Sequence, residues 1–204
     1  MTLRNITCAV TLCLLTLSGQ AVGKTEVPPY KNKSLSIEKR VDDLMGRMTL
    51  REKVLQLQNR GAGRLDEIDR IFNGESYGCT HEMGTTAAEC AAMYKELQQY
   101  MLTKTRLGIP IITSVEGIQG ILQNNCTLFP HALAQGSTFN PALIQRMTEA
   151  AGEEAKVIGI HQILSPVLDI ARELRWGRVE ETFGEDPYLI SEMGPPEIGR
   201  ASCR

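Results

Sequence analysis

The chain has 204 residues, a formal net charge of -2 and an apolar fraction of 42%. This composition is typical of a folded globular protein, and it excludes both the basic footprint of a nucleic-acid-binding protein and the polybasic patch of a membrane-surface protein. After residue 23, no stretch approaches the apolar length that a transmembrane helix needs.

Residues 1–23 have the pattern of a secretory signal peptide. Arg4 supplies the positive start, residues 9–17 the short apolar segment, and Ala21-Val22-Gly23 a small-x-small cleavage site. The alternative, a retained membrane anchor, is disfavoured because the apolar segment is too short to cross a bilayer. We therefore expect a secreted or periplasmic protein with no membrane contact in its mature form, and a linker over residues 24–35.

Helices are predicted where capping residues precede apolar residues at helical spacing. They are expected from the cap Ser36 to Arg47, from the capping box Thr49–Glu52 to about Asn59, from about Thr86 to Arg106, from Asn140-Pro141 to about Gly159, and from Asp186-Pro187 onward. Residues 61–86 carry only weak signals, and residues 130–139 are expected to form a loop or a short helix.

Two apolar runs of strand length, residues 109–115 and 162–170, alternate with these helices. Strands that are apolar throughout, rather than at every second residue, are typical of a parallel sheet covered by helices. In such α/β folds ligands bind at the carboxyl ends of the strands. The two ends carry Glu116 and the charged segment 175–181, so the sequence predicts a polar site there.

The candidate site residues are acids and arginines near one tryptophan. Glu116 stands between glycines after a strand, although a solvent-facing loop glutamate has the same pattern. Arg175 and Arg178 flank Trp176, and Glu180 follows. A guanidinium can donate two parallel hydrogen bonds to vicinal sugar hydroxyls, whereas the alternative is a structural ion-pair network. Trp176 is expected to pack or to stack on a sugar.

Other chemistries have little support in the sequence. The histidines His81, His131 and His161 are isolated, and no catalytic serine, zinc-protease or phosphate-loop motif occurs. Cys79, Cys90 and Cys126 form no CxxC pair, so no metal site is expected, although a Cys79–Cys90 disulfide remains an alternative. Glu116, Asp169 and Glu180 could supply a pair of acids of the glycosidase kind.

Several motifs occur in an order and spacing that resemble one family. They are residues 41–45 (VDDLM), 48–54 (MTLREKV), 105–110 (TRLGIP), 129–132 (FPHA), 165–169 (SPVLD), 175–178 (RWGR) and 184–187 (GEDP). Together they resemble the N-terminal part of glycoside hydrolase family 3, the secreted β-glucosidases and β-xylosidases. The resemblance covers nearly the whole of residues 36–194.

The resemblance implies an α/β fold that is the N-terminal part of a (β/α)8 TIM-type barrel, incomplete in this chain. It also implies hydrolysis of a terminal β-linked glycoside with retention of configuration, by two carboxylates and without a cofactor. The partner is then an oligosaccharide or glycoside substrate. Family members carry the nucleophile and the acid/base farther along, so no catalytic residue is assigned here and the fragment itself is expected to be inactive.

By the same resemblance, Glu116 and Arg175 match positions that hold the terminal sugar, and Arg178 and Glu180 are neighbouring candidates. Two departures stand out. Gln119 replaces a histidine that many members carry, and Glu173-Leu174 replaces the usual Asp-Pro. Gln119 bears on how Glu116 is held, and both departures leave the sugar substrate unassigned.

The last ten residues, 195–204, resemble the translation of a sequencing adapter and are expected to be non-native. The family domain would then end near Gly194, inside the barrel. The alternative function is a non-catalytic secreted sugar-binding protein that is complete as written. An NAD- or phosphate-using α/β enzyme is a remote alternative, because its glycine loop is missing.

Overall fold

The structure, a computed structural model, describes residues 27–82 and 85–198. The chain divides into two compact units, one ending at Gly46 and the other beginning at Arg47. The predicted signal peptide lies outside the described residues, and its processing stays a prediction. No helix within the described ranges is long and apolar enough to span a bilayer.

The first unit contains the 3-10 turn η1 (Pro29–Lys31) and helix α1 (Ile37–Arg47). The backbone N–H of Tyr30 donates to Asp43 Oδ2 at 3.1 Å, and Arg40 Nε donates to the Tyr30 carbonyl at 3.0 Å. The described part of the expected linker is therefore tied to α1. The helix itself is confirmed over the predicted residues.

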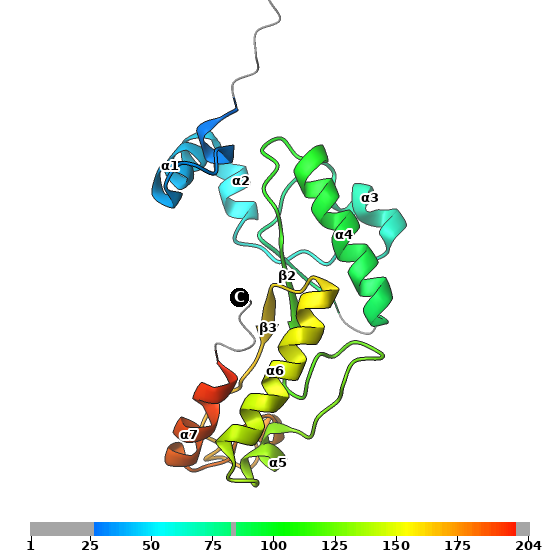
Figure 1. The fold of residues 1–204 in the computed structure, drawn as a ribbon. Helices are drawn as coiled ribbons and strands as arrows, with labels where there is room; N and C mark the ends of the chain where they lie inside the picture. Colours follow the sequence, from blue (N-terminus) through cyan, green and yellow to red (C-terminus); the bar gives the residue numbers. More distant parts are fainter. Residues whose placement is uncertain (1–26, 83–84, 199–204) are drawn as a thin grey trace, which may run out of the picture. The chain divides into compact units, whose positions relative to one another are not determined.

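The described residues of the second unit form six α-helices, which can be followed in Figure 1. They are α2 (Leu50–Leu55), α3 (Ile68–Phe72), α4 (Ala87–Lys104), α5 (Ala132–Gly136), α6 (Pro141–Ile158) and α7 (Pro187–Glu197), with 3-10 turns η2 (Leu65–Glu67) and η3 (Val179–Glu181). The predicted caps are confirmed. Thr49 and Thr86 form capping boxes, and the side chains of Asn140 and Asp186 accept from backbone N–H groups of α6 and α7.

Three short parallel strands form the sheet, in the order β1 (Cys79–His81), β2 (Ile112–Glu116), β3 (Gln162–Leu164). The α/β class with parallel strands is thus confirmed. The second predicted strand is shorter than residues 162–170, and the cis peptide Ser165-Pro166 follows it directly. Strand β1 lies within residues 61–86, the segment with only weak sequence signals.

The prediction that the second helix continues to about Asn59 is wrong. Helix α2 ends at Leu55, and Asn59 instead forms an isolated parallel bridge with Cys79 of β1. The Arg60 N–H donates to the Cys79 carbonyl at 2.9 Å, so the backbone groups of this segment are satisfied by the sheet rather than by a helix.

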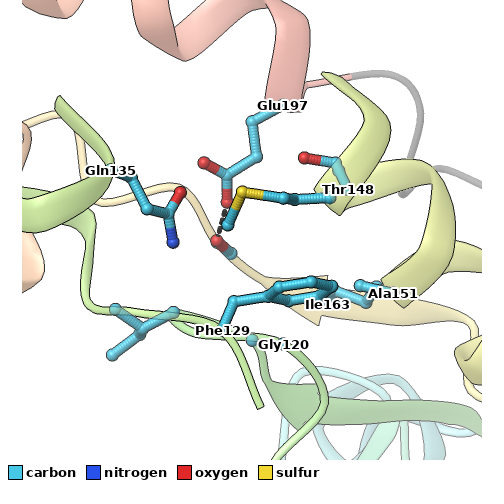
Figure 2. A pocket seen from close by; sticks show the side chains of 11 residues that line it. Gly120, Phe129, Gln135, Thr148, Ala151, Ile163 and Glu197 are labelled. Atoms are coloured by element: carbon cyan, nitrogen blue, oxygen red, sulfur yellow. Dashed lines mark hydrogen bonds between the residues drawn. The ribbon is translucent and has the colours of Figure 1, made fainter. Parts of the chain in front are cut away.

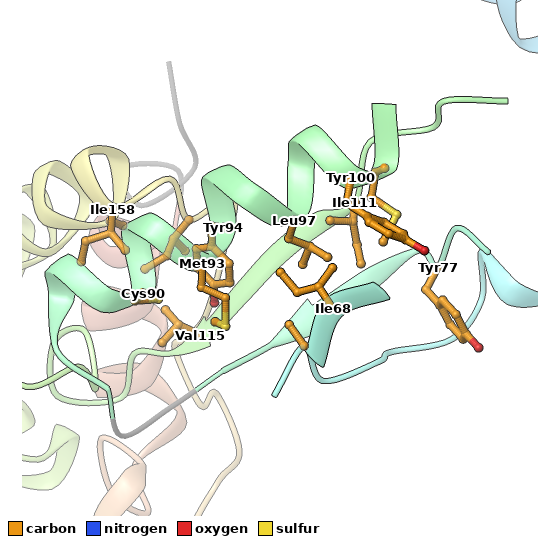
Figure 3. Close-up of a cluster of buried hydrophobic side chains, with 14 of the residues drawn as sticks. Ile68, Tyr77, Cys90, Met93, Tyr94, Leu97, Tyr100, Ile111, Val115 and Ile158 are labelled. Carbon is orange, nitrogen blue, oxygen red and sulfur yellow. The ribbon is translucent and has the colours of Figure 1, made fainter. Parts of the chain in front are cut away.

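The core lies between the helices and one face of the sheet. Tyr94, Leu97 and Tyr100 of α4 point toward Ile111 and Val115 at β2, as Figure 3 shows. Helix α6 contributes Ala151, Ala155 and Ile158 to the same cluster. The burial of these side chains fixes the strands against α4 and α6 and so holds the strand ends in place.

The three cysteines in the described ranges are free thiols, so a Cys79–Cys90 disulfide is not formed. The side chain of Cys79 contacts the Ser114 hydroxyl, 3.7 Å away. Cys90 is fully buried in the core cluster, where it packs as a small apolar residue.

Helix α7 continues through Pro195 and Pro196 to Glu197. These positions belong to the segment 195–204 that we expect to be non-native, and residues 199–204 lie outside the described part. The domain boundary near Gly194 stays a prediction.

Candidate functional site

The carboxyl ends of β1 and β2 bring two polar side chains together. His81 is the last residue of β1 and Glu116 the last of β2. In the parallel register His81 pairs with Ser114, and Glu116 follows two residues later. Since side chains alternate between the faces of a sheet, His81, Ser114 and Glu116 share one face, and the core side chain Val115 belongs to the opposite one.

The backbone of Glu116 belongs to β2, whereas its carboxylate accepts no described hydrogen bond. Its side chain is 31% exposed, and its one ion pair among the described residues is with His81, where Oε1 and Nε2 are 3.8 Å apart. The next residue must be a glycine, because a Cβ at Gly117 would collide with the Ile163 side chain of β3. The strand thus presents a carboxylate with free acceptor capacity at the sheet edge.

His81 was expected to be an isolated polar side chain, and the structure instead places it beside Glu116. Its Nδ1 lies 3.3 Å from Ser114 Oγ. Only the register of β1 against β2 reveals this contact, and three strand residues in a weakly patterned segment gave no signal for that register. His161, by contrast, hydrogen bonds through Nδ1 to Thr113 Oγ1 at 2.7 Å and ties two strands together.

Arg178 lies within electrostatic range of Glu116. Its guanidinium pairs with Glu181, with Nε to Oε2 at 2.7 Å. That hydrogen bond is the main cause of the raised pKa of Arg178, and the carboxylates of Glu116 and Asp169 add smaller contributions. Glu180 is exposed on η3. The structure therefore gathers Glu116, Asp169 and Arg178 in one electrostatic neighbourhood.

Arg175 lies on the surface, with its side chain 89% exposed. It donates to both carboxylate oxygens of Glu173, at 2.9 Å from Nε and 2.7 Å from Nη2. This pairing lowers the pKa of Glu173 to about 2. No described interaction joins Arg175 to Glu116, and Trp176 between the two arginines is half-buried. The predicted sugar-holding role of Arg175 stays a prediction.

A separate small cavity lies behind the loop that follows β2, lined among others by Phe129, Gln135, Thr148 and Glu197 (Figure 2). Its volume of about 20 Å³ holds one water molecule and is far too small for a sugar. Ser165 Oγ donates to the Glu197 carboxylate, and burial raises the pKa of that carboxyl group. This cavity is therefore a packing feature rather than the ligand site.

Within the described ranges, no group of three His, Cys, Asp or Glu side chains is placed to hold a metal ion. The strand ends place the Glu116 carboxylate beside the His81 imidazole, and Arg178 lies in the loop after β3. Such groups suit a neutral, multiply hydroxylated ligand, because hydroxyls can donate to a carboxylate and accept from N–H groups.

Parallel strands covered by helices, with polar side chains at the carboxyl ends of the strands, are typical of α/β enzymes that bind ligands at those ends. The family model described as "Glycosyl hydrolase family 3 N terminal domain" matches residues 49–198. The chain belongs to this family.

Relatives of the chain are named as β-xylosidases or β-glucosidases. A putative beta-xylosidase of Formosa agariphila is 35% identical over 184 residues, covering 83% of this chain and 24% of the relative. Beta-glucosidase C of Emericella nidulans is 34% identical over 184 residues, covering 82% and 30%. A periplasmic beta-glucosidase/beta-xylosidase of Dickeya chrysanthemi is 30% identical over 190 residues, covering 81% and 28%.

Among solved structures, a β-glucosidase from Erythrobacter marinus superimposes with a TM-score of 0.74 at 29% identity, covering 85% of this chain and 24% of that one. The chain thus spans between 24% and 30% of the length of these relatives. It corresponds to one part of a longer enzyme architecture.

Proposed function

We propose that the full-length protein carrying this chain hydrolyses terminal β-linked glycosides, in the manner of a β-glucosidase or β-xylosidase. Support comes from family membership and from relatives named for both activities. Export to the periplasm or the exterior fits the signal pattern of residues 1–23 and a relative named as periplasmic. Mass spectrometry of the mature protein tests export, with Lys24 expected as its first residue.

One observation carries the proposal for the site. The Glu116 carboxylate stands at the carboxyl end of a parallel strand, partly exposed, with no described hydrogen bond to its oxygens. In the proposed enzyme it accepts hydrogen bonds from hydroxyls of the terminal sugar. Arg175, Arg178 and Glu180 are proposed to lie along the same rim, where a guanidinium can donate to sugar oxygens.

The bond-breaking chemistry in this proposal uses two further carboxylates. One attacks the anomeric carbon to form a glycosyl-enzyme, and the other protonates the leaving oxygen and then activates water. We assign both to residues of the full-length protein outside this chain. The contribution of Glu116 is to orient the sugar, and its hydrogen bonds strengthen as the ring distorts toward the oxocarbenium-like transition state.

The full-length gene product tests this with nitrophenyl β-glucoside and β-xyloside as substrates. We expect hydrolysis by the unmodified enzyme and a loss of about 100-fold in kcat/KM for Glu116→Gln, because a charged hydrogen bond to the transition state is removed. Glu153→Gln, at an exposed glutamate of α6, is the matched control and should be unaffected. Sugar binding without any hydrolysis would favour the non-catalytic alternative instead.

A further inference from the structure

His81 and Glu116 form a pair that neither the sequence pattern nor the family assignment singles out. The two side chains come from adjacent strands and are 35 positions apart in sequence. They meet at the carboxyl ends of β1 and β2, with 3.8 Å between His81 Nε2 and Glu116 Oε1. The His81 side chain is only 19% exposed. The imidazole is therefore largely enclosed on the sheet surface, and its Nε2 faces the Glu116 carboxylate.

One hydrogen-bond arrangement around Ser114 satisfies both of its close polar neighbours. The Ser114 hydroxyl donates to the Thr80 carbonyl at 2.9 Å, and its oxygen accepts from a protonated His81 Nδ1, 3.3 Å away. With Nδ1 protonated, Nε2 bears either a lone pair or the second proton of an imidazolium, and only the second arrangement attracts the Glu116 carboxylate.

Ser114 is a rigid support for this arrangement. It is buried, its backbone carbonyl accepts from the Tyr94 hydroxyl at 3.1 Å, and its register partner is His81 itself. The ring is consequently held at both its backbone attachment and at Nδ1. A charged group oriented by a second, well-packed partner is a common means of keeping a binding side chain in its productive rotamer.

We propose that His81 is a positioning residue for Glu116, so that the pair, rather than the carboxylate alone, sets recognition of the terminal sugar. This inference rests on the proposed glycosidase function. Nε2 pairs with one carboxylate oxygen and leaves the other oriented for sugar hydroxyls. His81 acts through Glu116 and is not assigned a contact with the reacting atoms.

Two amide substitutions in the full-length enzyme separate the roles of the two ring nitrogens. His81→Gln puts an amide nitrogen near the position of Nε2, and His81→Asn puts one near the position of Nδ1. We expect His81→Asn to lower kcat/KM and the affinity for the free sugar product by about tenfold, a typical loss for an orienting residue, and His81→Gln to lower them less than about threefold. A role confined to bonding Ser114 predicts the reverse order.

The second half of the test is a double-mutant cycle with Glu116→Gln. If His81 acts through Glu116, His81→Asn should have little further effect once Glu116 is Gln. His131→Gln, at an exposed histidine preceding α5, is the control and should leave both constants unchanged. Unfolding midpoints of all variants check folding, and if His81→Asn does not fold, His81→Gln and Ser114→Ala carry the cycle.

Either the reversed order of the two amides or a full His81 effect persisting in the Glu116→Gln background would overturn the pairing. Absence of hydrolysis by the unmodified enzyme would instead refute the proposed function. In that case the same cycle, measured as affinity for glucose and xylose, still decides whether the two residues act together.

Discussion

At position 116 the length of the acid matters as much as its charge. A glutamate extends one methylene farther than an aspartate from the end of β2, which is why its carboxylate comes within 3.8 Å of His81 Nε2. In the proposed site we expect the longer side chain to crowd the hydroxymethyl arm of glucose, which xylose lacks. We therefore propose that Glu116 favours a pentose over glucose.

Glu116→Asp tests this directly. The shorter side chain should withdraw from His81 and open space near the sugar, raising the ratio of β-glucosidase to β-xylosidase kcat/KM by about tenfold, the scale of one methylene in a pocket. The two nitrophenyl glycosides, assayed with the full-length enzyme, give that ratio. An unchanged ratio would show that residue 116 does not set sugar preference.

The Arg175–Glu173 pair differs from the Glu116–His81 pair because both of its side chains lie on the surface. Both side chains are largely exposed, so solvent screening leaves the pair with little effect on stability despite its bidentate geometry. Because so little holds the pair together, the predicted role of Arg175 in holding a sugar would require it to give up only a weak partner. Glu173 stands where the family usually has aspartate before a proline, and a flexible glutamate can follow the guanidinium farther.

At the scale of elements, one ion pair joins two of the sequence motifs. Arg106, after α4, donates from Nε to Glu52 Oε1 at 2.8 Å and from Nη2 to the Arg47 carbonyl at 2.9 Å. Glu52 is at the same time the acidic member of the Thr49 capping box that starts α2. The motif at residues 48–54 and the motif at residues 105–110 therefore contact each other through this ion pair.

This contact gives a pH-dependent stability. The Arg106 hydrogen bond, with those from Thr49, lowers the pKa of Glu52 to about 2, whereas an unfolded glutamate titrates near ~4.3. The folded state thus binds a proton less readily, and the stabilisation is present above about pH 4.3 and lost as the pH falls toward 2. Since Arg106 is 55% exposed, we expect about 1 kcal/mol at neutral pH.

Arg106→Gln should accordingly lower the thermal midpoint of the full-length protein by about 1 °C at pH 7, because ~1 kcal/mol is small against the unfolding entropy of a protein several times longer than this chain, and by clearly less at pH 2.5. Arg64→Gln is the control. It removes an ion pair with Asp66 in which both side chains are largely exposed, so it should have almost no effect at either pH. A midpoint difference that stays constant between pH 7 and pH 2.5 would contradict the assignment of the effect to Glu52.

The starts of the long capped helices were predictable, whereas α3 and β1 were not, for physical reasons. Capping residues such as Thr86, Asn140 and Asp186 act locally, so their chemistry is visible in the sequence around each helix start. Strand β1 has three residues, of which only Thr80 is buried. It exists because Asn59 and β2 pair with it from either side, and pairing between distant segments leaves no local pattern.

The site residues also differ in whether the local sequence could predict their positions. Glu116 was predictable because a buried strand followed by an acid and a glycine is a local signal. His81 was not, because its proximity to Glu116 depends on the register of β1. The contact of Arg175 with Glu173 spans two residues, whereas the predicted approach of Arg175 to the sugar depends on the fold around the strand ends.

At the scale of the whole molecule, the sheet face that carries Glu116 is the face that the helices leave open. By strand alternation this face also bears Ile112 and Leu164, whose exposed fractions are 50% and 39%. Among the described residues no strand pairs beyond β3. In a closed (β/α)8 barrel the corresponding positions fill the interior and the edge is paired, so we propose that further strands of the full-length protein cover them.

Expression of this chain alone tests that proposal, because an open strand edge beside apolar side chains promotes self-association. Sedimentation velocity should show concentration-dependent association. In a separate assay the chain should not cleave nitrophenyl glycosides. Ile112→Lys, on the open face, should reduce the association, whereas Val157→Lys, on the exposed surface of α6, should not. A monomer that unfolds cooperatively would mean that the described residues need no further strands, and measurable turnover would mean that the catalytic carboxylates lie within this chain.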